Sequence, residues 1–319
     1  MISHDDLLKA IPRALTGVDV PGLGEKVKGK VRDIYRVDGR RVLITTDRVS
    51  AFDRVLGYIP YRGQVLNQLS LWWFDQTQAI VPNHVIATPD PNVTIAREAK
   101  ALPVEVIVRG FITGVTGTSM WTLYEQGDRM PYGILLPEGL SKNDPLPQPV
   151  ITPTTKATDG GHDERLTRDE LLGRGLVDRA LWERIEMVAL ALFDFGQRAA
   201  EQAGLILVDT KYEFGLVDGE LLLIDEIHTP DSSRYWVRDS YGGEGDPEHY
   251  DKEYLRLWFA GQGYRGEGEP PNMPDDFIAQ VAGRYIDAYE RLTGRDFRPA
   301  AQPTGSRIAD SLHRYFAQS

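Results

Sequence analysis

The chain has 319 residues, a net charge of −11 and no cysteine, and its composition is that of an ordinary soluble globular protein of about two domains. The negative charge argues against a nucleic-acid or membrane surface, and the lack of cysteine excludes disulfides, thiol catalysis and zinc–sulfur sites. No apolar run resembles a signal-peptide core or reaches transmembrane length, so we expect a cytoplasmic protein that binds any anionic substrate through local clusters of arginine and lysine.

A glycine-containing basic segment opens the first predicted sheet. Residues 27–37 and 41–46 are expected to be strands that flank an Asp-Gly turn. The preceding residues nearly spell a P-loop, but valine replaces the required Ser or Thr and a strand follows, so that interpretation fails. Two alternatives remain: a strand–turn–strand that covers phosphates with Lys30 and Arg32 on one face, or an exposed edge strand with solvated basic residues.

The next segments alternate loops with single elements. TTDRVSAFD, residues 45–53, is expected to be a polar loop, and an apolar stripe predicts a helix over residues 65–78. Residues 102–108 are predicted to be a buried strand that bears Glu105 and leads into Arg109. The following GFITGVTGTSMW could hold a phosphate or form a simple turn.

Residues 137–165 form the longest stretch without periodicity and are rich in proline. Such segments in compact domains are usually functional lids or disordered linkers, and the charged residues within 154–164 favour a lid. A capping box at Thr167 and Glu170 then precedes a long amphipathic helix over residues 177–203.

A hairpin with charges inside two apolar strands is predicted next. The strands are residues 205–214 and 220–227, and an Asp-Gly dipeptide provides the turn. Because side chains alternate along a strand, Asp209, Lys211 and Glu213 share one face.

The register of this hairpin decides which carboxylate joins that row. A strict two-residue turn places Glu226 opposite Lys211, whereas one bulged residue brings Asp225 toward Glu213. Two carboxylates ~4 Å apart repel by about 4 kcal/mol at an effective dielectric of about 20. A divalent cation would relieve this repulsion, and hard oxygen ligands favour Mg²⁺; the alternative is a salt-bridge network that Lys211 closes.

The remaining chain predicts a mainly helical segment, with a helix over residues 274–293 that Gly294 ends and another over residues 307–316. Three parts are therefore expected. They are a β-rich lobe over residues 1–102, a central α+β domain over residues 103–237 and a helical segment over residues 238–319.

Six sequence blocks resemble, in the same order, those of the SAICAR synthetase (phosphoribosylaminoimidazole-succinocarboxamide synthase) family. They read GKVRDIY, TTDRVSAFD, LPVEVIVRGFITG, TPTTKATDGGHDE, LVDTKYEFG with LIDEIHTPDSSRYW, and YDKEYLR. The resemblance implies a purine-biosynthesis ligase that condenses carboxyaminoimidazole ribonucleotide (CAIR) with L-aspartate at the expense of ATP, through an acyl phosphate. It also implies an α+β fold, in which an antiparallel N-terminal lobe related to kinase and ATP-grasp nucleotide-binding lobes packs on the central domain.

The resemblance further implies residue roles. Lys211, Glu213 and Asp225 would be catalytic, and Glu213 and Asp225 would hold Mg²⁺, which favours the bulged register. ATP would contact Lys30, Arg32 and backbone near Ala99 and Leu102. The ribonucleotide would contact Arg109, Ser119, Asp209, Arg234, Lys252 and Arg256, and aspartate would contact Lys156, Asp47 and Ser50.

One departure from the family pattern and two other functions remain. The family has T-G-S soon after V-R-G, but residues are inserted here, so the hydroxyl group could belong to Thr116, Thr118 or Ser119. A small-molecule kinase could use the same type of nucleotide lobe. An inactive nucleotide-binding regulator should have lost at least one of the three catalytic candidates, and all three are present.

Overall fold

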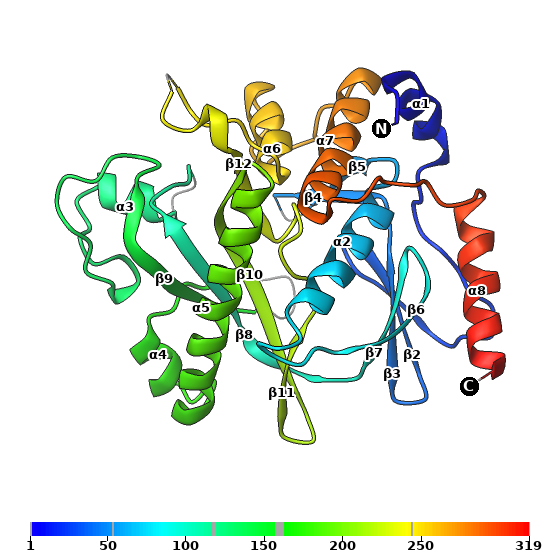
Figure 1. Ribbon diagram of the computed structural model, residues 1–319, viewed down its shortest axis with the longest axis horizontal. Coiled ribbons are helices and arrows are strands. Elements are labelled where there is room, and N and C mark those ends of the chain that lie inside the picture. The colour runs from blue at the N-terminus through cyan, green and yellow to red at the C-terminus, as the bar shows by residue number, and fades with distance from the viewer. Residues whose placement is uncertain (1, 53, 116–118, 157–162, 244, 319) are drawn as a thin grey trace.

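The computed structural model describes residues 2–52, 54–115, 119–156, 163–243 and 245–318 (Figure 1). Within these ranges the strands form two five-stranded sheets and a two-stranded sheet, and the fold is a mixed α+β fold with antiparallel sheets. Helices cover the sheets and dominate the last part of the chain. Within the same ranges, every helix is too short or too polar to cross a membrane.

The first sheet has the strand order β1-β2-β3-β7-β6. Its strands are β1 (Lys26–Lys28), β2 (Arg32–Val37), β3 (Arg40–Thr45), β7 (Val93–Arg97) and β6 (Val85–Asp90). The strand expected over residues 27–37 is therefore split by a tight turn, which the bond from Gly29 N to Arg32 O closes at 2.8 Å. The Asp-Gly turn after β2 is confirmed, because Asp38 and Gly39 both have the positive φ angles that such a hairpin turn requires.

The loop expected over residues 45–53 contains a strand. β4 (Arg48–Ala51) pairs with β5 (Arg54–Tyr58) in the two-stranded sheet, which follows β3 along the chain. The predicted helix after it is present as α2 (Arg62–Gln76).

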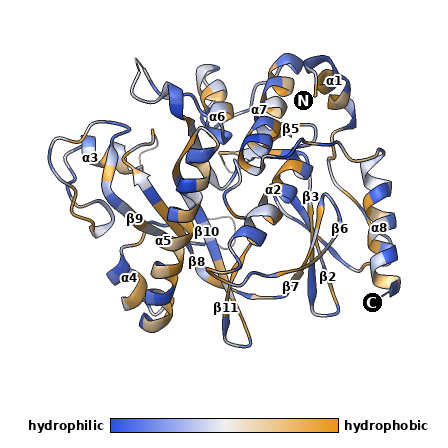
Figure 2. Cartoon of the chain, in the orientation of Figure 1, coloured by the Kyte–Doolittle hydropathy of each residue, from blue (hydrophilic) through white to orange (hydrophobic). Residues whose placement is uncertain are grey.

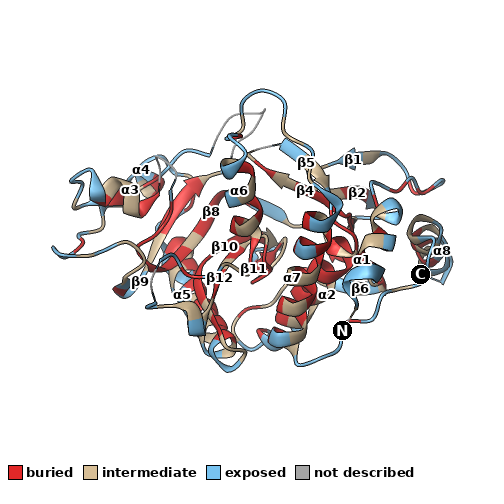
Figure 3. Cartoon of the chain, turned by 90° about the horizontal axis from the view of Figure 1, so that it is seen from above, coloured by how far each residue is buried: buried red, intermediate tan, exposed pale blue. Residues whose placement is uncertain are grey.

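The second sheet has the order β11-β10-β8-β9, and β12 also pairs with β10. Its strands are β8 (Lys100–Phe111), β9 (Pro145–Thr155), β10 (Leu205–Val217), β11 (Glu220–Ile224) and β12 (Ser233–Val237). Strand β10 is central because β8, β11 and β12 all pair with it. Buried residues are concentrated on β8 and β10, as Figure 3 shows.

The proline-rich segment expected to lack regular structure contains the eleven-residue strand β9. Proline cannot donate a hydrogen bond to a neighbouring strand, but β9 is at the edge of the sheet, where one side of the strand needs no partner. Residues 157–162 of the predicted lid lie outside the described residues.

The register of the β10–β11 hairpin is the strict one. Glu213 lies opposite Ile224 and Val217 lies opposite Glu220, so the turn has two residues and no bulge. The bulged register that the family resemblance favoured is therefore wrong, and β11 ends before Asp225.

Helices pack on both sheets and carry hydrophobic and hydrophilic faces (Figure 2). They are α1 (His4–Ala10), α3 (Met120–Glu125), α4 (Arg168–Gly173), α5 (Arg179–Gln202), α6 (Lys252–Gly261), α7 (Asp275–Thr293) and α8 (Thr304–Gln318). The predicted capping box begins α4, α5 covers β10, and Gly294 in a left-handed conformation ends α7 as predicted.

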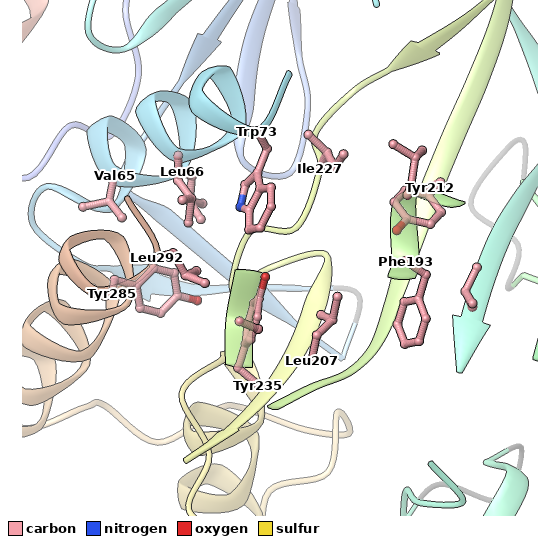
Figure 4. Packing of buried hydrophobic residues seen from close by; sticks show 14 of the residues in the cluster. Val65, Leu66, Trp73, Phe193, Leu207, Tyr212, Ile227, Tyr235, Tyr285 and Leu292 are labelled. Atoms are coloured by element: carbon pink, nitrogen blue, oxygen red, sulfur yellow. The ribbon is translucent and has the colours of Figure 1, made fainter. Parts of the chain in front are cut away.

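The C-terminal helices pack against the N-terminal half of the chain. α7 lies against α1 and α2, and α8 lies against β6 (Figure 1). Trp73 of α2, Ile227 and Tyr235 meet in the core that joins α2 and α7 to the second sheet (Figure 4). Ile308 and Leu312 of α8 complete the core of the first sheet.

Acid should destabilise the fold through His84, which lies buried beside Phe74. Burial lowers the pKa of His84 to about 4, from an ordinary value of 6.5. The unfolded chain therefore binds a proton that the folded state excludes, so the stability that is present above pH ~6.5 is lost as the pH falls. At pH 5 we expect His84 to account for a loss of about 2 kcal/mol in the free energy of unfolding.

Urea unfolding of the wild type and of His84→Gln at pH 7 and pH 5 measures this loss. The variant should lose about 2 kcal/mol less than the wild type on acidification. The exposed His313 provides the matched control, and His313→Gln should keep the wild-type pH dependence. Equal losses in wild type and His84→Gln contradict the prediction.

Candidate functional site

A cavity of about 680 Å³ lies where the β1–β2 turn, β4, β12 and α6 meet. Its basic lining residues are Lys30, Arg234, Lys252, Arg256 and Arg265. Among the described lining residues the one carboxylate is Glu253, which pairs with Arg256 at 3.0 Å. Such a concentration of positive charge in a protein of net charge −11 predicts an anionic ligand.

One wall of this cavity is anchored by a row of three charges across three strands. Asp209 of β10 lies opposite Arg109 of β8 and Arg234 of β12. Its carboxylate accepts a 3.0 Å bond from Arg109 Nη1 and a 3.1 Å bond from Arg234 Nε. Burial would raise the pKa of Asp209, but the charges of Arg234 and Arg109 outweigh it and lower the pKa. Two guanidinium groups on one carboxylate leave the row with a net positive charge.

Both arginines lie within strands and do not follow strand ends as the sequence suggested. Arg234 lines the cavity directly. Arg109 is fixed from a second side, because its Nε donates to Thr152 Oγ1 at 3.0 Å.

Ser119 also lines the cavity and begins α3. Gly114 has a φ of 111°, and a Cβ there would lie 2.4 Å from the Cβ of Ser119, so only glycine allows this approach. The other two candidate hydroxyl groups, Thr116 and Thr118, lie outside the described residues.

Lys252 reaches the cavity from α6 and is held by a buried carboxylate that the sequence did not reveal. Asp231 Oδ2 accepts a 2.8 Å bond from Lys252 Nζ and pairs with the fully buried Arg62, and Asp231 Oδ1 accepts a 2.8 Å bond from the hydroxyl of Tyr285. Burial opposes the charge of Asp231, but Arg62 and then Lys252 lower its pKa. Asp231 therefore ties α2, α6 and α7 to one edge of the cavity.

A second, smaller cavity of about 160 Å³ lies between the two five-stranded sheets. Its apolar lining residues are Ile34, Leu43, Ala99, Ala101 and Ile224, and its polar ones are Arg32, Arg41, His84, Arg97, Lys156, Glu213 and Asp225. Ala99, expected near ATP, is one of these lining residues. Leu102 lies in the hydrophobic core and does not line the cavity.

A cluster of alternating charges lies at this second cavity. Glu213 is directly opposite Glu105 of β8, and Lys211 Nζ lies between them, 2.8 Å from Glu213 and 2.6 Å from Glu105. Lys156 pairs with the other oxygen of Glu213. Burial would lower the pKa of Lys211, but the charges of Glu213 and Glu105 raise it. The like-charge pair is thus formed with β8 and not with the second strand of the hairpin, and Lys211 closes it into a salt-bridge network.

Asp225 reaches the same cavity through a left-handed backbone conformation and not through a bulge. It is the first residue after β11 and has a φ of 69°, a left-handed conformation that turns the chain out of the strand. Its carboxylate pairs with Arg32, which also approaches Glu226 at 3.6 Å. Burial opposes the charge of Asp225, but Arg32 and then Lys211 lower its pKa. Glu213 and Asp225 thus line one cavity even though the register is strict.

Lys30 and Arg32 were expected on one face, but they line different cavities. Lys30 lies in the β1–β2 turn and lines the larger one, whereas Arg32 begins β2 and lines the smaller one. The turn therefore stands between the two.

The TTDRVSAFD residues divide between cavity and core. Ser50 lines the larger cavity. Asp47 is buried, and its carboxylate accepts bonds from the backbone N–H groups of Leu15 and Gly63 at 2.7 and 2.8 Å. Burial raises the pKa of Asp47 to about 6. Because both carboxylate oxygens accept from backbone, Asp47 holds the start of α2, and it lines neither of the two cavities.

Comparison with known proteins gives consistent results. The family model for SAICAR synthetase matches residues 25–271. A phosphoribosylaminoimidazole-succinocarboxamide synthase of Legionella pneumophila (strain Lens) is 51% identical over 314 residues, which cover 96% of this chain and 99% of that protein. A chloroplastic enzyme of the same name from Arabidopsis thaliana is 50% identical over 298 residues, 91% of this chain and 72% of that protein.

Solved structures are similar over most of the chain. A SAICAR synthase from Saccharomyces cerevisiae in complex with SAICAR has a TM-score of 0.79 and 32% identity, and the match covers 90% of this chain and 100% of that one. A SAICAR synthetase in complex with ADP has a TM-score of 0.66 and 24% identity, and the match covers 86% of this chain and 100% of that one.

Proposed function

The chain belongs to the SAICAR synthetase family, and we propose that it condenses CAIR with L-aspartate to give SAICAR, while ATP is converted to ADP and phosphate. It is a ligase of de novo purine biosynthesis. The main support for this reaction is the presence of two cavities, one basic and one partly apolar, with the β1–β2 turn between them.

The reaction needs an activated carboxylate, because a free carboxylate is a poor acyl donor. An oxygen of the CAIR carboxylate attacks the γ-phosphorus of ATP, and the bond from that phosphorus to ADP breaks. The amino nitrogen of L-aspartate then attacks the carboxyl carbon, phosphate leaves and the nitrogen loses a proton. Phosphoryl transfer between two anions depends mainly on positioning and charge neutralisation.

We assign CAIR to the larger cavity. Arg109, Asp209, Arg234 and Ser119 would bind the ribonucleotide, and Lys252 and Arg256 would contact its 5′-phosphate. The support is the excess of cations at this wall and the fixed geometry of the three-strand row. A guanidinium held on one side by a carboxylate is pre-organised for a second anion, because little rotamer freedom is left to lose.

We assign ATP to the smaller cavity and its phosphates to the turn. The adenine would lie between the apolar side chains of the two sheets and contact the backbone near Ala99 and Leu102. Arg32 and Lys30, on either side of the turn, would hold the phosphates, and Lys211 would contact the carboxylate being activated. This arrangement would make the first sheet a nucleotide-binding lobe of the kinase and ATP-grasp type.

Glu213 and Asp225 fit a magnesium ion by the chemistry of their donors. Both offer hard carboxylate oxygens at one cavity, and each already carries a cationic partner, Lys156 for the first and Arg32 for the second. The described residues form no group of three or more potential ligands, so oxygens of ATP or water would complete the coordination. When bound, Mg²⁺ would neutralise the charge that develops on the transferred phosphoryl group.

Lys156 is the candidate for a carboxylate of L-aspartate, together with Ser50. Its side chain is 41% exposed and pairs with Glu213, and a half-exposed ammonium group can exchange that partner for a ligand. The cytoplasmic location stays a prediction, since the Arabidopsis relative is named as chloroplastic.

The reaction is tested by phosphate release from ATP with CAIR, in the presence and absence of L-aspartate. A ligase releases phosphate steadily only when all three substrates are present. A small-molecule kinase would form ADP with CAIR alone while the phosphoryl group stays on its product, so ADP is measured beside phosphate. An inactive regulator would bind ATP and form neither ADP nor phosphate.

Arg109→Met and Arg234→Met should each weaken CAIR binding by about ten- to hundredfold, because one charge-assisted contact is worth about 1.5–3 kcal/mol. ATP affinity should stay within about twofold, since neither arginine lines the smaller cavity. Calorimetric titration measures both affinities. Arg36→Met, an exposed arginine of β2, is the matched control and should bind CAIR normally. Normal CAIR affinity in both test variants would show that Arg109 and Arg234 do not bind CAIR.

Glu213→Gln and Asp225→Asn should lose most of the stabilisation that Mg·ATP provides. A ligand that binds only the folded state adds RT ln(1 + [L]/Kd), about 2.7 kcal/mol at a hundredfold excess over Kd. Glu226→Gln should keep this gain, because Glu226 does not line the cavity and its Oε2 accepts a 2.7 Å bond from Thr229. Thermal melts with and without Mg·ATP compare the three. If Glu226→Gln loses the response while Asp225→Asn keeps it, the metal ligand is Glu226.

A further inference from the structure

Two residues of the TTDRVSAFD block, Thr46 and Arg48, donate hydrogen bonds to the backbone of the β1–β2 turn. Its three successive carbonyl groups, at residues 29, 30 and 31, all accept hydrogen bonds from Arg48 or Thr46. Arg48 Nη2 donates to the carbonyl of residue 29 at 3.1 Å, and Arg48 Nε donates to that of residue 30 at 3.1 Å. The carbonyl of residue 31 accepts from Thr46 Oγ1 at 2.7 Å and from Thr46 N at 3.0 Å.

Arg48 is itself fixed on its other side. It is 2% exposed, and its Nη2 also donates to Asp33 Oδ1 at 2.9 Å while Nη1 donates to the carbonyl of Thr16 at 2.8 Å. Asp33 is fully buried, and its second oxygen accepts a 2.8 Å bond from Val18 N. The guanidinium therefore has one geometry available, with its charge compensated and its donors directed at the turn.

The other contacts described for the turn are its closing bond from Gly29 N to Arg32 O and the pairing of β1 with β2. β1 has three residues, two of them exposed, and β2 is its one partner within the described strands. A hairpin arm this short is marginally stable by itself. The rigidity of the turn therefore depends on the carbonyl bonds to Arg48 and Thr46.

We infer that Arg48 and Thr46 are positioning residues that hold the β1–β2 turn, so that Lys30 reaches the larger cavity while Arg32 reaches the smaller one. This inference rests on the proposed function, in which the turn lies between the two substrates that exchange a phosphoryl group. Neither residue touches substrate; they act through Lys30. Because phosphoryl transfer depends on positioning, a shift of about 1 Å in the turn can lower the rate by about a hundredfold.

Arg48→Lys separates the charge from the geometry. A lysine keeps the positive charge beside Asp33 but cannot donate to both turn carbonyls as the planar guanidinium does. We expect kcat to fall by about ten- to hundredfold while the KM values for ATP and CAIR change less than about fivefold, because the loss falls on the transition state.

Thr46 offers a matched pair of substitutions. Thr46→Val keeps the volume and removes the bond from Oγ1, and it should lower kcat in the same way. Thr46→Ser keeps that hydroxyl and should restore kcat to near the wild-type value. Arg307→Lys is the control for an ion-paired arginine lost elsewhere. Arg307 is partly buried, pairs with Asp90 of β6 at the opposite edge of the first sheet from β1, and lines neither cavity. It should change stability without changing kcat.

Amide hydrogen exchange provides a readout that does not depend on turnover. In Arg48→Lys and Thr46→Val the amides of residues 29–32 should exchange at least tenfold faster than in wild type, while those of α5 keep their rates. In Arg307→Lys the turn should keep wild-type exchange. If the turn exchanges normally in both test variants, or if kcat stays within twofold of wild type, the positioning role is overturned. If the wild type makes no SAICAR, the proposed function is wrong. The exchange result then still decides whether Arg48 and Thr46 hold the turn.

Discussion

The structure depends on charges buried in pairs across neighbouring strands. β10 places Asp209, Lys211 and Glu213 at alternate positions on one face. Arg109 and Glu105 of β8 compensate the first two, and Lys156, just after β9, pairs with Glu213. An uncompensated buried charge costs about 3–5 kcal/mol when one partner of a pair is lost. A slip of one residue between β8 and β10 would turn the whole row to the other face and leave several such charges. The residues that bind substrate therefore also fix the strand register on which the site is built.

The same pairing explains how an acidic protein can present a basic cavity and a carboxylate cluster close together. Without ligand, every carboxylate at the smaller cavity has a lysine or arginine beside it. Binding Mg·ATP would then exchange partners within a set of charges that is already removed from water. Such an exchange avoids most of the desolvation penalty that a newly buried ion pair would carry.

Local patterns predicted the parts of the fold that depend on local chemistry. Gly294 ends α7, the capping box begins α4, and both Asp-Gly turns are hairpin turns, because each signal is contained in a few consecutive residues. The charged row of β10 was visible for the same reason. β9 was missed because its prolines suggest a loop, and only its edge position makes them acceptable.

Contacts between distant segments had no local signal. The pair of Arg62 with Asp231, and that of Arg48 with Asp33, join elements whose charges look solvated when each is considered alone. The left-handed conformation of Asp225 was missed for a related reason, since aspartate tolerates it but does not require it. These contacts hold Lys252, Lys30 and other residues that line the cavities. The candidate site residues could therefore be named from the sequence, but their division between two cavities could not.

The position of α8 has a consequence for how the protein forms during synthesis. Ile308 and Leu312 fill the core of the first sheet beside Val42 and Ile95, which the ribosome delivers much earlier. Chains usually fold from the N-terminus as they emerge. In this chain, part of the apolar face of the first sheet stays uncovered until α8 has been synthesised. Until then the nascent lobe carries exposed apolar surface, which makes partly folded chains prone to aggregate.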